Sequence, residues 1–170
     1  MNSTKLPCPI IGIGSTPSCS HPPIDGLKGV NEMHPGNYFV YDLTQYTIGS
    51  CEKKDIATRV LTRVIGHYPG SNMLLIDLGW TGCSAQGSQS GYGAFDGHPE
   101  LFIEALKQEA GEVTGRNGET LDFDKYPIGM ILKLIPHHSC SAAAMHRTVK
   151  IVNDTEEVVD EWKACRGWSL

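Results

Sequence analysis

Short apolar segments of the β-strand type recur along this chain, and turn-forming residues separate most of them. Val60, Thr62 and Val64 alternate with their neighbours, which is typical of a strand that has one well-buried face. Glycine, proline, asparagine and aspartate occupy the breaks and predict turns. The segments that we predict as strands are 9–13, 30–33, 38–43, 57–68, 73–78, 128–135, 145–152 and 156–162.

Two of the predicted turns join neighbouring strands into hairpins. Pro69-Gly70-Ser71-Asn72 connects the strands at 57–68 and 73–78, and Asn153-Asp154 connects the last two strands. A third hairpin is predicted at 113–121, with Arg116-Asn117-Gly118 at its tip.

Helical periodicity is convincing in one segment only, residues 98–110. Its apolar residues are spaced as on one face of a helix, and Gly111 would end it. Residues 79–97 are rich in glycine and predict a long loop, which is either functional or a surface excursion. Many strands with one or two short helices predict a mainly β fold, either a β-barrel or a sandwich.

Composition excludes several classes of partner. The chain has 170 residues, of which 40% are hydrophobic and 19% charged, as in ordinary globular proteins. With a net charge of −5 and no basic run, nucleic acid and anionic membranes are excluded as partners. The apolar stretches are too short to cross a bilayer, and no signal peptide is evident. The six scattered cysteines form no Cys-x-x-Cys pair, so we expect reduced thiols and a cytoplasmic protein.

The segment most suggestive of chemistry is His138-Ser139-Cys140, directly after the apolar strand at 128–135. In extended backbone, residues two apart project to the same side, so the imidazole and the thiolate would lie together. Such a pair favours zinc, although the same spacing also occurs at ordinary strand ends. His137 would then point to the opposite side as a packing or solvent-facing residue. His146, on the predicted last hairpin, is interpreted as a surface or cross-strand residue rather than a third ligand.

A second candidate is the turn Gly14-Ser15-Thr16, which follows the predicted strand at 9–13. Backbone N–H groups and hydroxyls at such a turn suit a phosphate, while a plain turn is the other interpretation.

Four segments of the chain, in order, resemble the eukaryotic-type D-serine dehydratases and the related D-threonine aldolases. These are pyridoxal-phosphate (PLP) enzymes of the alanine racemase fold type, and the resemblance spans most of the chain. The four segments are residues 12–18, residues 32–42, residues 77–84 beginning Asp77-Leu78-Gly79-Trp80, and Pro136-His137-His138-Ser139-Cys140-Ser141-Ala142-Ala143.

The resemblance implies roles for both candidate segments. Gly14, Ser15 and Thr16 would bind the PLP phosphate, and His138 and Cys140 would bind the metal. The related D-threonine aldolases have a His-x-Asp pattern and a harder metal. This chain has Cys140 at the position of that aspartate, and a soft thiolate favours zinc and the dehydratase branch. The implied reaction converts D-serine to pyruvate and ammonia, with a D-amino acid as the partner and a homodimer as a further expectation.

One departure from the family limits this expectation. None of the lysines lies in a sequence resembling the family's PLP-binding lysine, which belongs to an N-terminal barrel. We therefore expect the chain to lack that barrel, with residues 1–29 as a remnant of its end plus a linker and residues 30–170 as the β-rich domain. Such a chain would be inactive alone, so whether it is an enzyme stays open. The alternative is a stand-alone metal-binding, regulatory, structural or dimerisation domain.

Overall fold

A computed structural model describes residues 8–165, which fall into two compact units. One unit ends at Ala57 and the other begins at Thr58. The predicted division after residue 29 rests on the family resemblance and stays a prediction.

The N-terminal unit is built around a short parallel pair of strands, β1 (Gly12–Gly14) and β2 (Glu32–His34). Helix α1 (Thr16–Ser20) follows β1 after a single residue, and helix α2 (Leu43–Thr47) lies further along. The side chain of Asp42 caps α2 by accepting a hydrogen bond from the backbone N–H of Gln45 at 2.9 Å. Short 3-10 turns cover Asn37–Phe39 and Lys53–Asp55.

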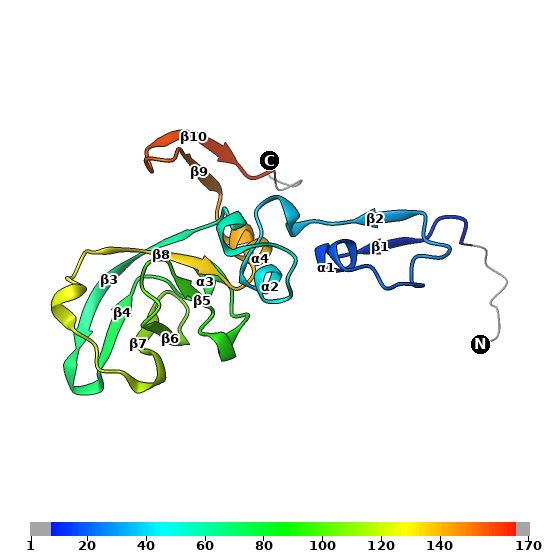
Figure 1. Cartoon of the computed structure of the whole chain (residues 1–170). Helices are drawn as coiled ribbons and strands as arrows, with labels where there is room; N and C mark the ends of the chain where they lie inside the picture. The colour runs from blue at the N-terminus through cyan, green and yellow to red at the C-terminus, as the bar shows by residue number, and fades with distance from the viewer. Residues whose placement is uncertain (1–7, 166–170) are drawn as a thin grey trace. The chain divides into compact units, whose positions relative to one another are not determined.

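The second unit contains a six-stranded antiparallel sheet in the order β5-β8-β3-β4-β7-β6. Its edge strands β5 and β6 approach each other, so the sheet curls into a nearly closed barrel (Figure 1). The predicted mainly β fold is therefore confirmed, in its barrel form. The strands are β3 (Val60–Tyr68), β4 (Met73–Ile76), β5 (Gly93–Phe95), β6 (Leu101–Leu106), β7 (Gly111–Gly115) and β8 (Ile131–Pro136).

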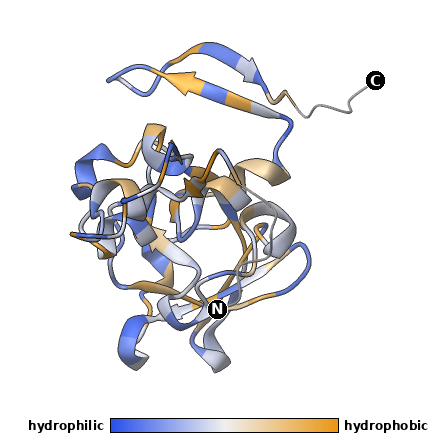
Figure 2. Ribbon diagram, turned by 90° about the vertical axis from the view of Figure 1, so that its right-hand side faces the viewer, coloured by the Kyte–Doolittle hydropathy of each residue, from blue (hydrophilic) through white to orange (hydrophobic). Residues whose placement is uncertain are grey.

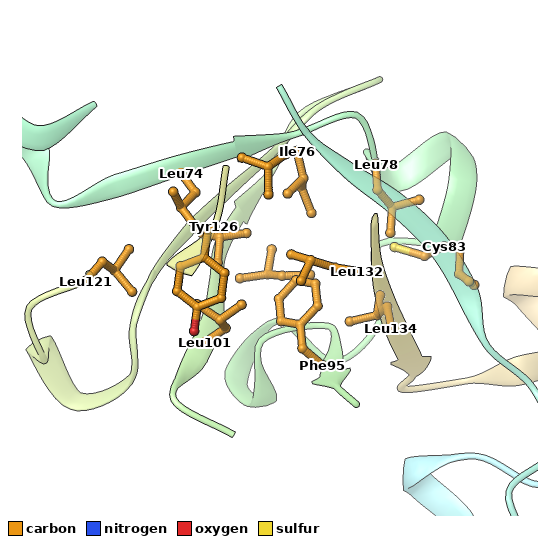
Figure 3. Close-up of a cluster of buried hydrophobic side chains, with 14 of the residues drawn as sticks. Leu74, Ile76, Leu78, Cys83, Phe95, Leu101, Leu121, Tyr126, Leu132 and Leu134 are labelled. Carbon is orange, nitrogen blue, oxygen red and sulfur yellow. The ribbon is translucent and has the colours of Figure 1, made fainter. Parts of the chain in front are cut away.

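The barrel encloses one cluster of buried apolar side chains, shown in Figure 3. Strand β3 shows why the sequence folds this way, because Val60, Thr62 and Val64 are buried while Leu61 and Ile65 are exposed. The most deeply buried apolar members are Val64, Leu74, Ile76, Leu101, Ile103, Val113, Leu132, Leu134 and Ala142.

Two short helices accompany the barrel, α3 (Trp80–Cys83) and α4 (Ser139–Met145). Short 3-10 turns lie at Pro69–Ser71, Ser88–Ser90, Arg116–Gly118 and Phe123–Lys125. With α1 and α2, the described residues contain four short α-helices, whereas one or two were predicted. Across residues 8–165, no helix combines the length and apolarity needed to cross a bilayer.

After α4 the chain forms a two-stranded hairpin, β9 (Thr148–Val152) and β10 (Val158–Lys163), which pairs with no strand of the barrel. The hairpin extends away from the barrel (Figure 1), and an ion pair between Lys133 of β8 and Glu156 in the hairpin turn joins the two. Both strands of the hairpin contain hydrophobic residues (Figure 2). Val149, Val158 and Trp162 are each at least 45% exposed.

Both hairpins predicted at tight turns are confirmed. β3 pairs with β4 around the turn at Pro69–Ser71, and Asn72 adopts the left-handed conformation that closes it. β9 pairs with β10, with an irregularity in register next to Val158.

The predicted helix at 98–110 is wrong, because this segment contains strand β6, which pairs with β7. Leu101 and Ile103 are buried with the period of two expected of a strand. The register then shifts between Ile103 and Ala105. Such a bulge inserts one residue into the alternation, so apolar residues fall two and then three apart and imitate a helical period. The third predicted hairpin is also wrong, since β7 pairs with β6 and β4 and the turn at Arg116–Gly118 follows it.

The predicted strand at 38–43 is wrong as well. The backbone N–H groups of Val40 and Tyr41 both donate to the carbonyl of Asn37, which makes a tight turn instead of an extended segment. Tyr41 has a φ of 53°, and Asp42 then caps α2. Capping and turn chemistry prevail here over the strand propensity of the aromatic residues.

Candidate functional site

The candidate metal ligands lie where strand β8 gives way to helix α4. Pro136, the last residue of β8, pairs with Gly93 of β5, so the sheet fixes the start of the segment. His138 is extended, with φ −133° and ψ 107°, and is the N-cap residue of α4. Cys140 lies in the first turn of that helix and is exposed.

The extended backbone that was expected through Cys140 is therefore wrong beyond His138. Helix α4 begins at Ser139, because the run Ala142–Ala144 consists of the residue with the highest helix propensity. The two side chains are thus presented by a strand-to-helix junction and not by the pleat of a strand. The assignment of His138 and Cys140 as metal ligands stays a prediction.

Gln86 holds the imidazole of His138 from the loop that follows α3. The Nδ1 atom of His138 lies 2.6 Å from Oε1 of Gln86. The hydroxyl of Ser141, one turn into α4, donates to the same oxygen at 2.8 Å. Sequence reasoning missed Gln86 and Ser141, and the one signal was the glycine-rich segment 79–97, for which a functional loop was one interpretation.

The other two histidines of this region serve packing. His137 is half-buried, its Nδ1 lies 3.1 Å from the hydroxyl of Ser90, and its backbone N–H donates to the carbonyl of Tyr92. His146 ends α4, and its Nε2 lies 2.7 Å from the carbonyl oxygen of Gly82 next to α3. His137 agrees with its interpretation as a packing or solvent-facing residue. His146 was expected on the strand predicted at 145–152, but it ends α4 and is half-buried, and β9 begins at Thr148.

The cysteine of α3 differs from Cys140 in its surroundings. Cys83 is 2% exposed and belongs to the buried apolar cluster. Burial raises the pKa of this thiol to about 11, so it stays protonated at neutral pH. A protonated thiol is a poor metal ligand, and Cys140 is therefore the thiol of this region that a metal ion in solution could reach.

In residues 8–165, no group of three or more His, Cys, Asp and Glu side chains is arranged to hold a metal ion. A metal at His138 and Cys140 would accordingly have two protein ligands and complete its coordination with water or substrate.

The predicted phosphate-binding turn lies in the N-terminal unit. Gly14 ends β1, Ser15 has a φ of 90°, and α1 begins at Thr16. The hydroxyl of Ser15 lies 2.9 Å from that of Ser18, and Oγ1 of Thr16 accepts a hydrogen bond from the backbone N–H of Asn37 at 3.0 Å. A strand, a turn and a helix start follow one another, as they do in many phosphate-binding loops. The assignment to PLP stays a prediction.

Comparison with known proteins shows the family. The model described as "Putative serine dehydratase domain" matches residues 57–152, which is more than half of the chain. A D-serine dehydratase of Dictyostelium discoideum is 36% identical over 169 residues, which cover 93% of this chain and 43% of that protein.

Solved structures show the same relationship. The D-threo-3-hydroxyaspartate dehydratase of Delftia sp. HT23 superposes with a TM-score of 0.78 at 29% identity, covering 96% of this chain and 46% of that chain. Two variants of a D-threo-3-hydroxyaspartate dehydratase are also known, one with a histidine replaced by alanine and one, in a metal-free form, with a cysteine two positions later replaced by alanine.

A third relative is matched by this chain over nearly its whole length. An uncharacterized protein of Mycobacterium tuberculosis is 28% identical over 132 residues, which cover 74% of this chain and 96% of that protein.

The barrel and its match to dehydratase structures over nearly the whole chain define a dehydratase-type β-domain. The chain belongs to the D-serine dehydratase domain family, and it spans less than half the length of the D-serine and D-threo-3-hydroxyaspartate dehydratases named above.

Proposed function

We propose that this chain is the metal-binding C-terminal domain of a D-serine dehydratase-like lyase that depends on PLP and zinc. The observation that carries the proposal is the junction between β8 and α4, which presents His138 and the exposed thiol of Cys140 two residues apart. The related dehydratase supports it, because its variants replace a histidine and a cysteine at the same spacing and its cysteine variant was solved metal-free.

The donor set fits zinc. One imidazole nitrogen and one thiolate are soft ligands that select zinc over magnesium or manganese. His138 has one nitrogen occupied by Gln86, which leaves the other for a metal ion. When bound, zinc would supply a Lewis acid that assists departure of the substrate hydroxyl.

The turn Gly14-Ser15-Thr16 fits the phosphate of PLP by the chemistry of its groups. An added Cβ at Gly14 would meet no atom within 4 Å, so a ligand can approach the backbone there. The Thr16 hydroxyl accepts from Asn37, so its own proton remains available for a phosphate oxygen. PLP would supply the electron sink for α-proton removal. The lyase reaction also needs the PLP-binding lysine of the family, so we expect the isolated chain to be inactive.

We extend the proposal to the cellular compartment, the substrate and the oligomeric state. All six cysteines are free, which suits a reducing, cytoplasmic environment. A D-amino acid is the proposed substrate of the complete enzyme, and a homodimer is the proposed assembly.

A stand-alone domain without catalysis is the second candidate function. It is favoured by the mycobacterial relative, which this chain covers over 96% of its length. Such a domain would bind metal or a second subunit without converting D-serine.

The test uses the 170-residue chain and one substitution at each of the two proposed ligands, His138 and Cys140. We expect one zinc ion per chain, loss of binding in His138→Ala, and a shift of preference from zinc towards manganese in Cys140→Asp, because a carboxylate is a harder ligand. Metal titration followed by elemental analysis measures all three. Equal metal preference of Cys140→Asp and the unmodified chain would refute the proposed site.

Catalysis is tested separately. Pyruvate release from D-serine, measured after PLP is added, should be absent for this chain and should appear when a barrel carrying the PLP-binding lysine is supplied. Zinc binding without pyruvate release in that combination would favour the stand-alone domain.

A further inference from the structure

Gln86 contacts one ring nitrogen of the candidate metal ligand His138. Its Oε1 atom lies 2.6 Å from Nδ1 of His138 and accepts a hydrogen bond from the hydroxyl of Ser141. An amide oxygen has no proton to give, so the hydrogen of the shorter contact belongs to the imidazole. This contact fits the neutral tautomer of His138 that carries its proton on Nδ1 and its lone pair on Nε2.

The loop that carries Gln86 is anchored against the segment that carries His138. Gly87 packs on the preceding histidine so closely that an added Cβ would lie 2.2 Å from Cγ of His137. Ser90 contacts the ring of the same histidine, and its Oγ also donates to the carbonyl of Gly87. His137 and His138 therefore contact the adjacent loop residues Gly87 and Gln86. These contacts fix the position of Gln86 although its side chain is exposed.

We propose that Gln86 is a positioning residue that selects the Nδ1–H tautomer of His138 and so makes Nε2 the metal-binding nitrogen. The proposal rests on the proposed function, in which His138 is a ligand. Metal-bound histidines usually donate their second ring N–H to an oxygen acceptor, and losing that acceptor weakens metal binding about 10- to 100-fold. Ser141 supports the same arrangement by holding the amide oxygen in place.

The first test needs no metal. In the metal-free chain at about pH 8, where histidine is neutral, nitrogen-15 chemical shifts report which ring nitrogen is protonated. We expect His138 to be protonated on Nδ1 in the unmodified chain. In Gln86→Met, which keeps the length of the side chain and removes the acceptor, we expect the proton to move to Nε2, as neutral imidazole prefers in water. A proton on Nε2 in the unmodified chain, or no change in Gln86→Met, would overturn the proposal.

The second test measures zinc affinity by competition with a chromophoric chelator. We expect Gln86→Met to bind zinc about 10- to 100-fold more weakly and Gln86→Glu to retain affinity, because a carboxylate accepts the same proton. Gln89→Ala is the matched control, an exposed glutamine of the same loop outside the His138 contacts. Thermal unfolding of each variant shows whether the fold is kept.

The two tests separate this inference from the proposed function. If the unmodified chain binds no zinc, the proposed metal site fails, and the tautomer measurement alone decides the role of Gln86. If the chain binds zinc and Gln86→Met binds it equally well, the positioning role fails and the metal site stands.

Discussion

Tyr126 is the residue at which the buried apolar cluster meets an ionised group. Its ring is 2% exposed, and its hydroxyl donates a hydrogen bond to Oε1 of Glu100. This hydrogen bond is the main reason why the pKa of Glu100 lies below its usual value, and nearby His98 lowers it further. Burial, followed by the contact with Glu100, raises the pKa of Tyr126.

The pair gives a pH-dependent prediction for Tyr126→Phe. Folding lowers the pKa of Glu100, so the ionised carboxylate stabilises the folded state. This stabilisation is fully present above the pKa of the unfolded chain, about 4.3, and is lost as the pH falls through the folded pKa. We expect Tyr126→Phe to reduce the free energy of unfolding by about 1 kcal/mol at neutral pH, a modest value because Glu100 is 39% exposed. The difference should shrink at about pH 3, where the carboxylate is protonated in both proteins.

Urea unfolding at the two pH values measures this difference. Glu100→Gln is the control, since it cannot ionise and should remove the pH dependence of the comparison. An undiminished difference at the acidic pH would contradict the assignment.

Residue types were easier to predict than residue geometry. His138 and Cys140 were singled out by chemistry and resemblance, and the structure places both at one junction. Their backbone was predicted as extended because the apolar strand before them dominates the local pattern. The role of Gln86 could not be predicted from the sequence, because it contacts a residue 52 positions away and no periodic pattern indicates such a contact.

At the scale of elements, the sequence predicts the hairpins closed by tight turns, because the turn residues themselves determine the connection. Two of the failures lie where a bulge or a cap changes the pattern, and the third predicted hairpin failed because β7 pairs with β6 and β4 instead. The bulge in β6 gave a strand the spacing of apolar residues that is typical of a helix. Asp42, predicted within a strand, is instead the N-cap residue of α2. Bulges and caps depend on the neighbouring strand or turn, which a short window of sequence does not contain.

The loop between α3 and β5 gives a prediction at this scale. Gly87 in this loop and Gly97, which follows β5, both have a φ near +80°. An added Cβ would collide with His137 at Gly87 and would meet nothing within 4 Å at Gly97. We expect Gly97→Ala to cost about 1 kcal/mol in the free energy of unfolding, for the backbone strain alone. Gly87→Ala should cost about 2 to 3 kcal/mol, because the collision adds to the strain.

Chemical denaturation of both variants supplies the comparison, and the difference between them isolates the collision. Equal losses would mean that the loop moves away from His137 without cost.

At the scale of the whole molecule, stability is concentrated in the barrel. The buried cluster draws its members from the barrel strands and the segments around them, and none of its described members comes from β9 or β10. Substitutions should therefore have very different costs in these two regions.

Ile103→Ala and Trp162→Ala test that contrast. Ile103 is 1% exposed, so its truncation should cost about 2 to 5 kcal/mol through lost burial and a cavity. Trp162 is 56% exposed, so its loss should change the free energy of unfolding by no more than about 0.5 kcal/mol. Unfolding curves followed by far-ultraviolet circular dichroism suit both variants. A large loss in Trp162→Ala would show that the hairpin packs against something that supports the fold.

The hairpin of β9 and β10 also bears on which changes of sequence the fold can tolerate. The family model ends at residue 152, the last residue of β9, so it includes one strand of the hairpin and not the other. A ribbon that contributes nothing to the interior can change in length and sequence over generations while the barrel stays intact.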